Sequence, residues 1–388
     1  MMNKLLLIFC ILAIFGQSMY IILLLHLRRI WMKAPKYNRV HFDTLSDIKV
    51  SVLIALRNEE ANIISCLTAL KNQDIATNKF EIICVDDHST DKSVELINNF
   101  LNENPGFPLQ LLQIKEETKN GSPKKQALKA AVTKSSGKLL LFTDADCVVH
   151  QSWISTMAEF YTKHNAKMLC GPVVLQNSTA STLLSSYEEL DFISLQLCSA
   201  ASLLDKKPLM SNGANLGIDK NAYLNVIDKT LGKNLASGDD MFLMLALDKD
   251  FPGSIHYVNS EKAIVKTGFQ KSFLQLLMQR KRWASKGFKY ANSSIFAVSQ
   301  LVLFIHSALL VSAVISFIIP SLFPLFLGLF LSKTIVDYAF LLKAKLWLRK
   351  RLKLHQFVLF EFLNTLFVLL IIVVSLRKGF IWKGRKLN

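Results

Sequence analysis

The sequence predicts an α/β domain with a mostly parallel sheet, flanked by transmembrane helices. Three observations lead to this prediction. Of the 388 residues, 51% are hydrophobic and the mean hydropathy is +0.31, which is high for a soluble protein. Long apolar runs lie near both ends of the chain. The polar stretch between them alternates short apolar runs with segments of helical periodicity, as α/β domains do.

The first apolar run predicts an N-terminal membrane anchor within residues 1–30. Leu5 to Leu25 is a run of about 21 uncharged residues, enough to cross roughly 30 Å of hydrocarbon as a helix. A cleaved signal peptide is the alternative, but no small-x-small cleavage site is present and Arg28 and Arg29 follow closely. By the positive-inside rule this basic cluster places the following residues in the cytoplasm. We therefore expect an integral protein of a bacterial inner membrane whose domain faces the cytosol.

The C-terminal region, residues 291–388, predicts two or three further membrane helices. Its apolar runs lie at 295–319, 322–342 and 357–376. Three complete spans would leave the basic tail Arg377 to Lys386 outside, against the positive-inside tendency. One run is therefore expected to be re-entrant or interfacial. The candidate is the middle one, because Lys333 and Asp337 lie one helical turn apart and can pair away from lipid.

Net charge and cysteine usage exclude several function classes. The formal charge is +17, but many basic residues flank apolar runs, where anionic headgroups attract them. No aromatic-plus-basic motif accompanies them, so we expect no nucleic-acid partner. The six cysteines lack CxxC spacing, which argues against a zinc site or a disulfide framework and favours reduced thiols.

The polar region, residues 37–290, predicts strands that end in acidic or polar clusters. Buried-strand candidates are KVSVLIAL from Lys49, FEIICV from Phe80 and KLLLF from Lys138. In open parallel sheets, ligands gather at the carboxyl ends of the strands. The clusters that follow these three strands are Arg57 to Glu60, Asp86 with Asp87, and Asp144 with Asp146.

Each cluster has a structural and a functional interpretation. Asp144 and Asp146 can share Mg²⁺ or Mn²⁺ through oxygen ligands, although solvated loop aspartates also occur in this pattern. Asp86 and Asp87 fit a turn and helix cap, or hydrogen bonds to a nucleobase and ribose. Arg57 to Glu60 allows the same two interpretations. Their position at neighbouring strand ends favours the functional one.

Seven motifs together resemble the family 2 inverting glycosyltransferases with a GT-A fold. A single motif is weak evidence, but seven in the same order and spacing, over about Val50 to Gly287, are specific. The resemblance implies a nucleotide-diphospho-sugar transferase domain with a Rossmann-like sheet. The motifs are SVLIALRNEEANI, IICVDDHSTDKS, SPKKQAL, LLFTDADCVV, NGANLGIDKNAY, SGDDMFL and QRKRWASKG.

The resemblance implies a donor site. Glu59 and Asp86 or Asp87 would contact the base and ribose, and Asp144 would help to hold the nucleoside. Asp146 would ligate the metal that bridges the diphosphate, with Asp144 beside it. The basic residue of the KxxAL pattern would be Lys124, or Lys125 in its place. A metal is expected because the leaving nucleoside diphosphate needs electrostatic stabilisation.

The resemblance also implies a catalytic base and an acceptor site. Asp240 aligns with the general base, and Asp239 with its acidic neighbour; without the other motifs, the two could simply cap a helix. The GxN-like loop that ends at Asn215 would lie beneath the donor sugar. The QxxRW pattern would line the acceptor end, although in a generic helix Arg and Trp would be surface or membrane-interface residues. Its residues are Gln279, Arg282 and Trp283.

The predicted function is metal-dependent transfer of one sugar from a nucleotide-sugar to a lipid or membrane-associated acceptor at the cytosolic face. Helices flanking the domain would hold the site at the bilayer, so membrane lipids are expected partners. A processive polysaccharide synthase is the alternative, but it needs a translocation channel and only three or four spans are available. A non-catalytic protein with a glycosyltransferase-like binding domain is the second alternative. The presence of every expected carboxylate argues against it.

Overall fold

The structure is a computed structural model in which the chain divides into two compact units. The helical unit comprises residues 1–33, 181–201 and 270–378, and the sheet unit comprises 34–180, 202–269 and 379–388. Two stretches of the polar region, 181–201 and 270–285, thus belong to the helical unit. The structure describes residues 2–38, 48–114, 123–176, 182–231, 239–285, 293–344, 353–376, 380–382 and 385–387.

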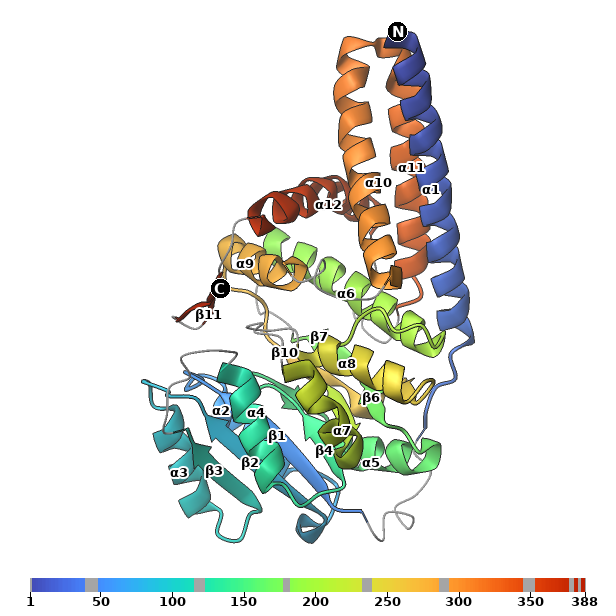
Figure 1. Cartoon of the computed structure of the whole chain (residues 1–388). Coiled ribbons are helices and arrows are strands. Elements are labelled where there is room, and N and C mark those ends of the chain that lie inside the picture. The colour runs from blue at the N-terminus through green and yellow to red at the C-terminus, as the bar shows by residue number, and fades with distance from the viewer. Residues whose placement is uncertain are drawn as a thin grey trace. The chain divides into compact units, whose positions relative to one another are not determined.

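A seven-stranded sheet in the order β3-β2-β1-β4-β8-β6-β9 forms the centre of the sheet unit (Figure 1). Strands β1 to β4 pair in parallel, whereas β8 is antiparallel to both β4 and β6. The prediction of a mostly parallel α/β sheet is therefore confirmed. The strands are β1 (Val50–Leu56), β2 (Phe80–Asp86), β3 (Leu109–Gln113), β4 (Leu139–Phe142), β6 (Met168–Cys170), β8 (Leu216–Asp219) and β9 (Ile255–Tyr257).

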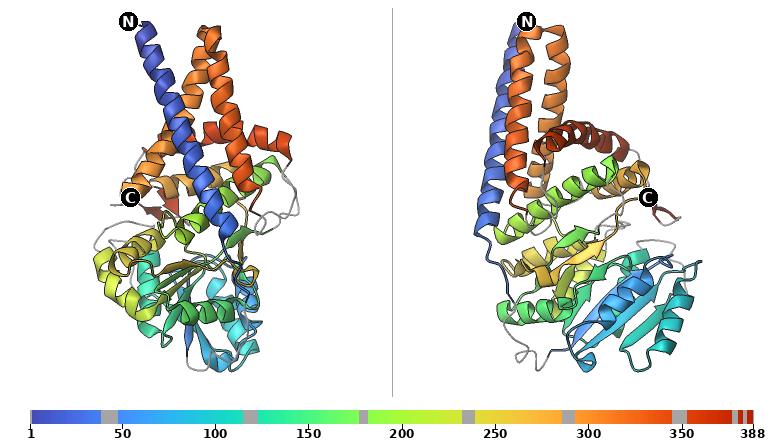
Figure 2. Two further views of the ribbon diagram at one scale, coloured as in Figure 1. Left: turned by 90° about the vertical axis from the view of Figure 1, so that its right-hand side faces the viewer. Right: turned by 180° about the vertical axis from the view of Figure 1, so that it is seen from behind.

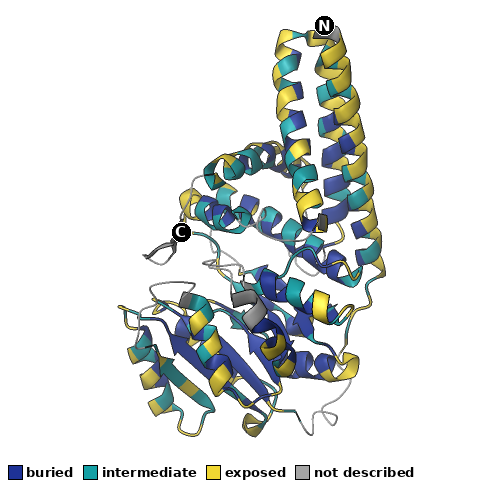
Figure 3. Cartoon of the chain, in the orientation of Figure 1, coloured by how far each residue is buried: buried dark blue, intermediate teal, exposed yellow. Residues whose placement is uncertain are grey.

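Helices and a second, small sheet complete the sheet unit. The central strands β1 and β4 are apolar except for Ser51 because both faces are covered, and Figure 3 shows them buried. In α2, buried side chains recur at Ile63, Leu67 and Leu70, the spacing of one helix face. The helices are α2 (Ile63–Lys71), α3 (Ser93–Glu103), α4 (Pro123–Lys134), α5 (Trp153–His164), α7 (Lys220–Leu231) and α8 (Asp239–Asp250). The short strands are β5 (Val148–Val149), β7 (Val173–Leu175) and β10 (Val265–Thr267), and a separate pair is β11 (Phe380–Trp382) with β12 (Arg385–Leu387).

Among its described residues, the helical unit contains four helices that are long and apolar enough to cross a membrane. Their apolar stretches are Lys4–Lys33, Ser294–Ile318, Pro320–Leu341 and Leu354–Ser375. Helices α1, α10 and α11 run side by side, and α12 lies across them in all three views (Figures 1 and 2). Helix α6 (Leu183–Leu204) belongs to this unit up to residue 201. The other helices of the unit are α1 (Met2–Lys33), α9 (Phe273–Ala284), α10 (Ser293–Ile318), α11 (Phe323–Leu341) and α12 (Leu354–Ser375).

The predicted pairing within α11 is confirmed, but α11 is not the helix that departs from the bundle. Lys333 Nζ donates to Asp337 Oδ2 at 2.6 Å, and both side chains are buried. Helix α11 nevertheless follows α1 along its length, since Gln17 Nε2 donates to Ser332 near its middle and Trp31 Nε1 to the carbonyl of Lys343 just beyond its end. Because Lys333 and Asp337 pair inside the bundle, their charges do not require α11 to leave it.

Candidate active site

The loops after β1 and β2 form one polar rim at the carboxyl edge of the sheet. Their side chains and backbones are joined by reciprocal hydrogen bonds. Asn58 Oδ1 accepts from the Thr90 amide at 2.8 Å, and Ser93 Oγ accepts from the Glu59 amide at 2.7 Å. Arg57 Nη1 donates to the Asp87 carbonyl at 2.7 Å. These bonds fix the two loops relative to each other, so they act as one rigid wall.

Three carboxylates predicted to contact the nucleoside lie in this rim. Glu59, Asp86 and Asp87 are only 8%, 4% and 4% exposed. A buried carboxylate needs hydrogen bonds, and each has one. Asp86 accepts from the Ser89 amide at 3.2 Å, Glu59 from Asn62 Nδ2 at 2.9 Å, and Asp87 Oδ1 lies 3.1 Å from His88 Nδ1. The rim is therefore acidic and pre-formed.

The turn after β4 carries the acidic pair predicted to hold a metal. A ligand atom from each of Asp144, Asp146 and Cys147 lies within 4.8 Å of the others. Lys124, at the start of α4, donates to Asp144 Oδ1 at 2.5 Å, so a basic residue faces this turn. Asp144 is partly exposed and Asp146 is exposed. Both carboxylates can thus be reached from solvent.

The donor set of this turn fits a hard divalent cation. Carboxylate oxygens are the ligands that Mg²⁺ and Mn²⁺ prefer. Burial, and then the charges of Asp146 and Asp144, raise the pKa of the Cys147 thiol well above its ordinary value. Cys147 is therefore a buried thiol that packs under the turn, and the two aspartates are the available ligands.

Sheet register brings Asp240 to the same edge. Phe142, the last residue of β4, pairs with Leu216, the first residue of β8. The loop that enters β8 therefore lies opposite the Asp144 turn. In that loop the Gly213 amide donates to Asp240 Oδ2 at 3.1 Å, and the Met241 amide donates to Asp240 Oδ1 at 2.9 Å. Both oxygens are thus oriented by backbone amides.

Asn215, predicted to lie beneath the donor sugar, has a structural task in the loop that enters β8. Its side chain is fully buried and its polar atoms are all engaged: Nδ2 donates to the carbonyls of Pro172 and Ala263, and Oδ1 accepts from Trp153 Nε1. A Cβ on Gly171 would lie 2.3 Å from Nδ2, so only glycine fits beside it. Asn215 holds the loop that presents Gly213 to Asp240.

Two further predicted residues are placed in part. Asp239 is the first residue of α8, but its side chain lies outside the described residues. Lys125, the alternative to Lys124, lies over the ring of Phe242 in α8, with Nζ 5.8 Å from the ring centroid. Lys124, rather than Lys125, thus contacts the acidic turn.

The QxxRW residues lie on α9 of the helical unit, with two partners that sequence reasoning missed. Arg280, within the motif, is 4% exposed. It donates through Nε to Asp191 Oδ2 of α6 at 2.7 Å and through Nη1 to Gln279 Oε1, and its guanidinium lies 4.3 Å from the ring centroid of Trp283. Asp191 and Arg280 are 89 residues apart, so only a tertiary contact could have indicated the pair.

The sheet and the acidic turn at its carboxyl edge define a GT-A domain. The fold resembles that of the mannosyltransferase PcManGT from Pyrobaculum calidifontis, solved with GDP-Man and Mn²⁺: the TM-score is 0.54 at 14% identity, covering 89% of this chain and 99% of that one. Residues 139–376 match the glycosyl transferase family group 2, and residues 51–198 match glycosyl transferase family 2. The chain therefore belongs to glycosyl transferase family group 2.

Curated relatives match a limited stretch. TarS of Staphylococcus aureus, a poly(ribitol-phosphate) beta-N-acetylglucosaminyltransferase, is 30% identical over 122 residues, 31% of this chain and 20% of TarS. A dolichyl-phosphate beta-glucosyltransferase of Dictyostelium discoideum is 30% identical over 108 residues, 26% of this chain and 32% of that protein. The chain thus matches about a fifth to a third of the length of these two relatives.

Proposed function

We propose that this protein transfers a sugar from a nucleotide-sugar donor to a lipid-linked or membrane-associated acceptor, with inversion at the anomeric carbon. The observation that carries the proposal is the carboxylate of Asp240, held by two backbone amides at the same sheet edge as the Asp144 turn. Family membership and the nucleotide-sugar bound in PcManGT support it.

Asp240 serves as the general base in this proposal. The acceptor hydroxyl oxygen attacks the anomeric carbon and gives its proton to the Asp240 carboxylate, while the bond from that carbon to the diphosphate oxygen breaks and the nucleoside diphosphate leaves with the electron pair. The Gly213 and Met241 amides and the N-terminus of α8 stabilise negative charge on the carboxylate before transfer.

The rim and the acidic turn bind the donor in this proposal. Glu59, Asp86 and Asp87 contact the base and ribose from the rigid wall made by the two loops. Asp144 and Asp146 hold Mg²⁺ or Mn²⁺, which when bound neutralises charge on the leaving diphosphate. Lys124 keeps Asp144 oriented through its 2.5 Å contact.

The acceptor is proposed to be phosphate-linked and membrane-associated, with the sheet unit on the cytosolic side. The names of the two relatives state phosphate-linked acceptors, a poly(ribitol-phosphate) and dolichyl phosphate. Four apolar helices in this chain are consistent with a site held at a bilayer. Gln279, Arg282 and Trp283 are the candidate acceptor contacts.

The test incubates the purified full-length protein with Mn²⁺ or Mg²⁺, membrane lipids and a panel of nucleotide-sugars, followed by mass spectrometry of the lipids. We expect a glycolipid one sugar heavier than its precursor; a ladder of products would favour a processive synthase. Asp240→Asn should lower turnover by about 10³-fold, within the range for a lost general base, without weakening nucleotide binding. Unchanged turnover in this variant would remove Asp240 from the mechanism.

A further inference from the structure

Helix α12 differs in direction from the other three candidate membrane spans. It is long and apolar enough to cross a bilayer, as are α1, α10 and α11. Those three run together, whereas α12 crosses their common direction in Figures 1 and 2. Length and composition therefore do not decide whether α12 spans the membrane. Its contacts within the helical unit decide this instead.

Helix α12 makes aromatic contacts with α6 and α9, besides the contact of Phe357 with Tyr338 of α11. The ring of Tyr187 on α6 lies 5.2 Å from Phe360 and 5.3 Å from Phe367, measured between centroids, and its hydroxyl donates to Asn364 Oδ1 at 3.0 Å. Phe273 of α9 lies 5.7 Å from Phe367. Helix α12 is thus packed on α9 as well as on the bundle.

This packing sets the depth of α12, because α9 is strongly basic. Arg280 is paired with Asp191, and Lys281 and Arg282 follow it on α9 as two further cations, which the centre of a bilayer disfavours. Helix α9 therefore belongs at the level of the headgroups or outside them. A helix lying against it cannot run perpendicular to the membrane through the hydrocarbon centre.

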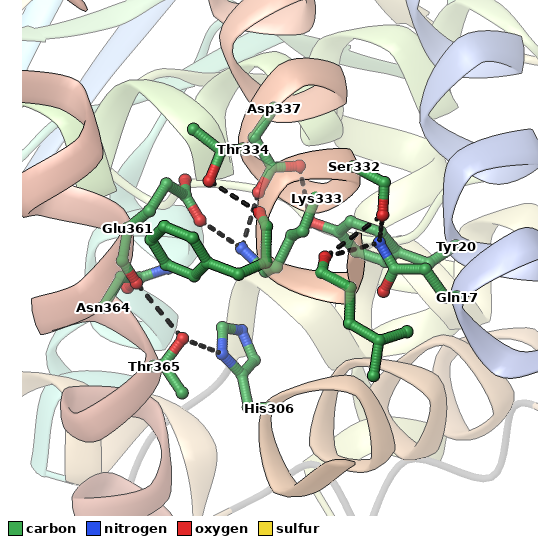
Figure 4. Close-up of polar contacts among 12 residues, drawn as sticks. Gln17, Tyr20, His306, Ser332, Lys333, Thr334, Asp337, Glu361, Asn364 and Thr365 are labelled. Carbon is green, nitrogen blue, oxygen red and sulfur yellow. Dashed lines mark hydrogen bonds and ion pairs between the residues drawn. The ribbon is translucent and has the colours of Figure 1, made fainter. Parts of the chain in front are cut away.

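An ionic cluster joins α12 to α11 (Figure 4). Glu361 of α12 is 2% exposed and accepts from Lys333 Nζ at 2.5 Å, while Asp337 accepts from both Lys333 and the Tyr20 hydroxyl. Lys333 lies about two turns before the end of α11. Helices α1 and α11 end together, since Arg28 donates to the Ala339 carbonyl.

The remaining face of α12 is apolar and exposed. Its residues recur three or four apart, the spacing of one helix face, and are 38% to 64% exposed: Leu354, Val358, Phe362, Leu366, Leu370 and Val373. Basic residues flank the helix, Lys353 before it and Arg377 with Lys378 after it. Acyl chains match the stripe and anionic headgroups match the flanks, as for an in-plane membrane helix.

We propose that α12 lies in the plane of the bilayer, in the leaflet at which α1 and α11 end, so that the chain has three spans. The exposed apolar face of α12 contacts the acyl chains of that leaflet. The basic tail after Ser375 then lies on the same side as Arg28 and Arg29. This arrangement removes the conflict with the positive-inside rule that a fourth span creates.

Side-specific labelling tests the topology in whole cells. An impermeant maleimide is applied to full-length protein in a Cys10→Ser, Cys198→Ser background, because the other four cysteines are buried. Lys36→Cys reports the side of the sheet unit, Ser321→Cys the opposite side, and Asn388→Cys the tail. We expect the tail to label as Lys36→Cys does. If Asn388→Cys instead reacts from the same side of the membrane as Ser321→Cys, α12 is a fourth span and the proposal is overturned.

Depth measurement tests the orientation of α12 independently. Spin labels at Leu354→Cys, Phe362→Cys and Leu370→Cys in proteoliposomes are compared for access to oxygen and to a polar nickel chelate. We expect three similar depths. A spanning helix would instead separate its outer positions by about 24 Å along the membrane normal and overturn the proposal. Phe296, Phe304 and Phe317 on α10, exposed positions of a proposed span, are the matched control and should differ in depth.

Discussion

The two units use carboxylates in opposite ways. In the sheet unit, Asp144 and Asp146 are reachable from solvent beside one lysine. In the helical unit, Asp337 and Glu361 are buried, and both are bound by Lys333. Solvent reaches the first pair, whereas the second pair is bound by protein groups inside the bundle. Aspartate and glutamate thus attach helices to one another in the helical unit, and in the sheet unit they lie where a ligand can approach.

The largest effect is expected where a buried charge loses its partner. Lys333→Met leaves the carboxylates of Asp337 and Glu361 side by side without a cation, and should destabilise the protein by about 3–5 kcal/mol. Unfolding of the detergent-solubilised full chain measures it. The matched control replaces all three groups, Lys333→Met with Asp337→Leu and Glu361→Leu, and should recover most of the loss. Equal stability of the single variant and the wild type would show that the cluster is not ionic.

The opposite outcome is expected for the exposed pair. Asp146→Asn should leave stability within about 0.5 kcal/mol of the wild type, as for most surface substitutions. It should lower kcat/KM about 10²-fold and raise the Mn²⁺ concentration needed for half-maximal transfer, because one carboxylate ligand is lost. Glu103→Gln, an exposed acid at the end of α3, is the control. If Asp146→Asn lowered stability but left the Mn²⁺ concentration for half-maximal transfer unchanged, the contrast between exposed and buried carboxylates would be contradicted.

The acidic clusters were predictable because their signals are local. An apolar run followed at once by Asp86 or Asp144 identifies a strand end, and parallel pairing then brings such ends to one edge. The task of Asn215 was not predictable, since its partners Pro172 and Ala263 are 43 and 48 residues away. The direction of α12 was also hidden, because its composition is that of a span and only its contacts with α6 and α9 distinguish it.

A smaller effect is expected at a pair that combines burial with positioning. Asp191→Asn removes the carboxylate that holds Arg280 against Gln279 and Trp283, and misplacing these side chains should lower kcat/KM for the acceptor about 10-fold. Nucleotide affinity should not change. Glu261→Gln, from an exposed ion pair with Lys36, is the control. A KM for the acceptor and a kcat both equal to wild type would show that Arg280 needs no anchor.

The smallest effect is expected at His256, which lies in a basic cluster of the sheet unit. Burial, then the charges of Lys206 and His164, lower the pKa of His256 from 6.5 to about 4. Lys206 Nζ lies 3.3 Å from His256 Nδ1, and the His164 ring centroid lies 5.5 Å from that of His256. The unfolded chain therefore binds a proton near pH 6.5, whereas the folded chain resists it until about pH 4.

Stability should consequently fall as the pH drops from 6.5 to 4 and then become independent of this group. Because the His256 ring is only half-buried, the loss should be about 1 kcal/mol or less. His256→Gln should flatten the slope of unfolding free energy against pH in that window, whereas His355→Gln, at an exposed imidazole, should not. An unchanged slope in the first variant would mean that His256 has the same pKa in the folded and the unfolded chain.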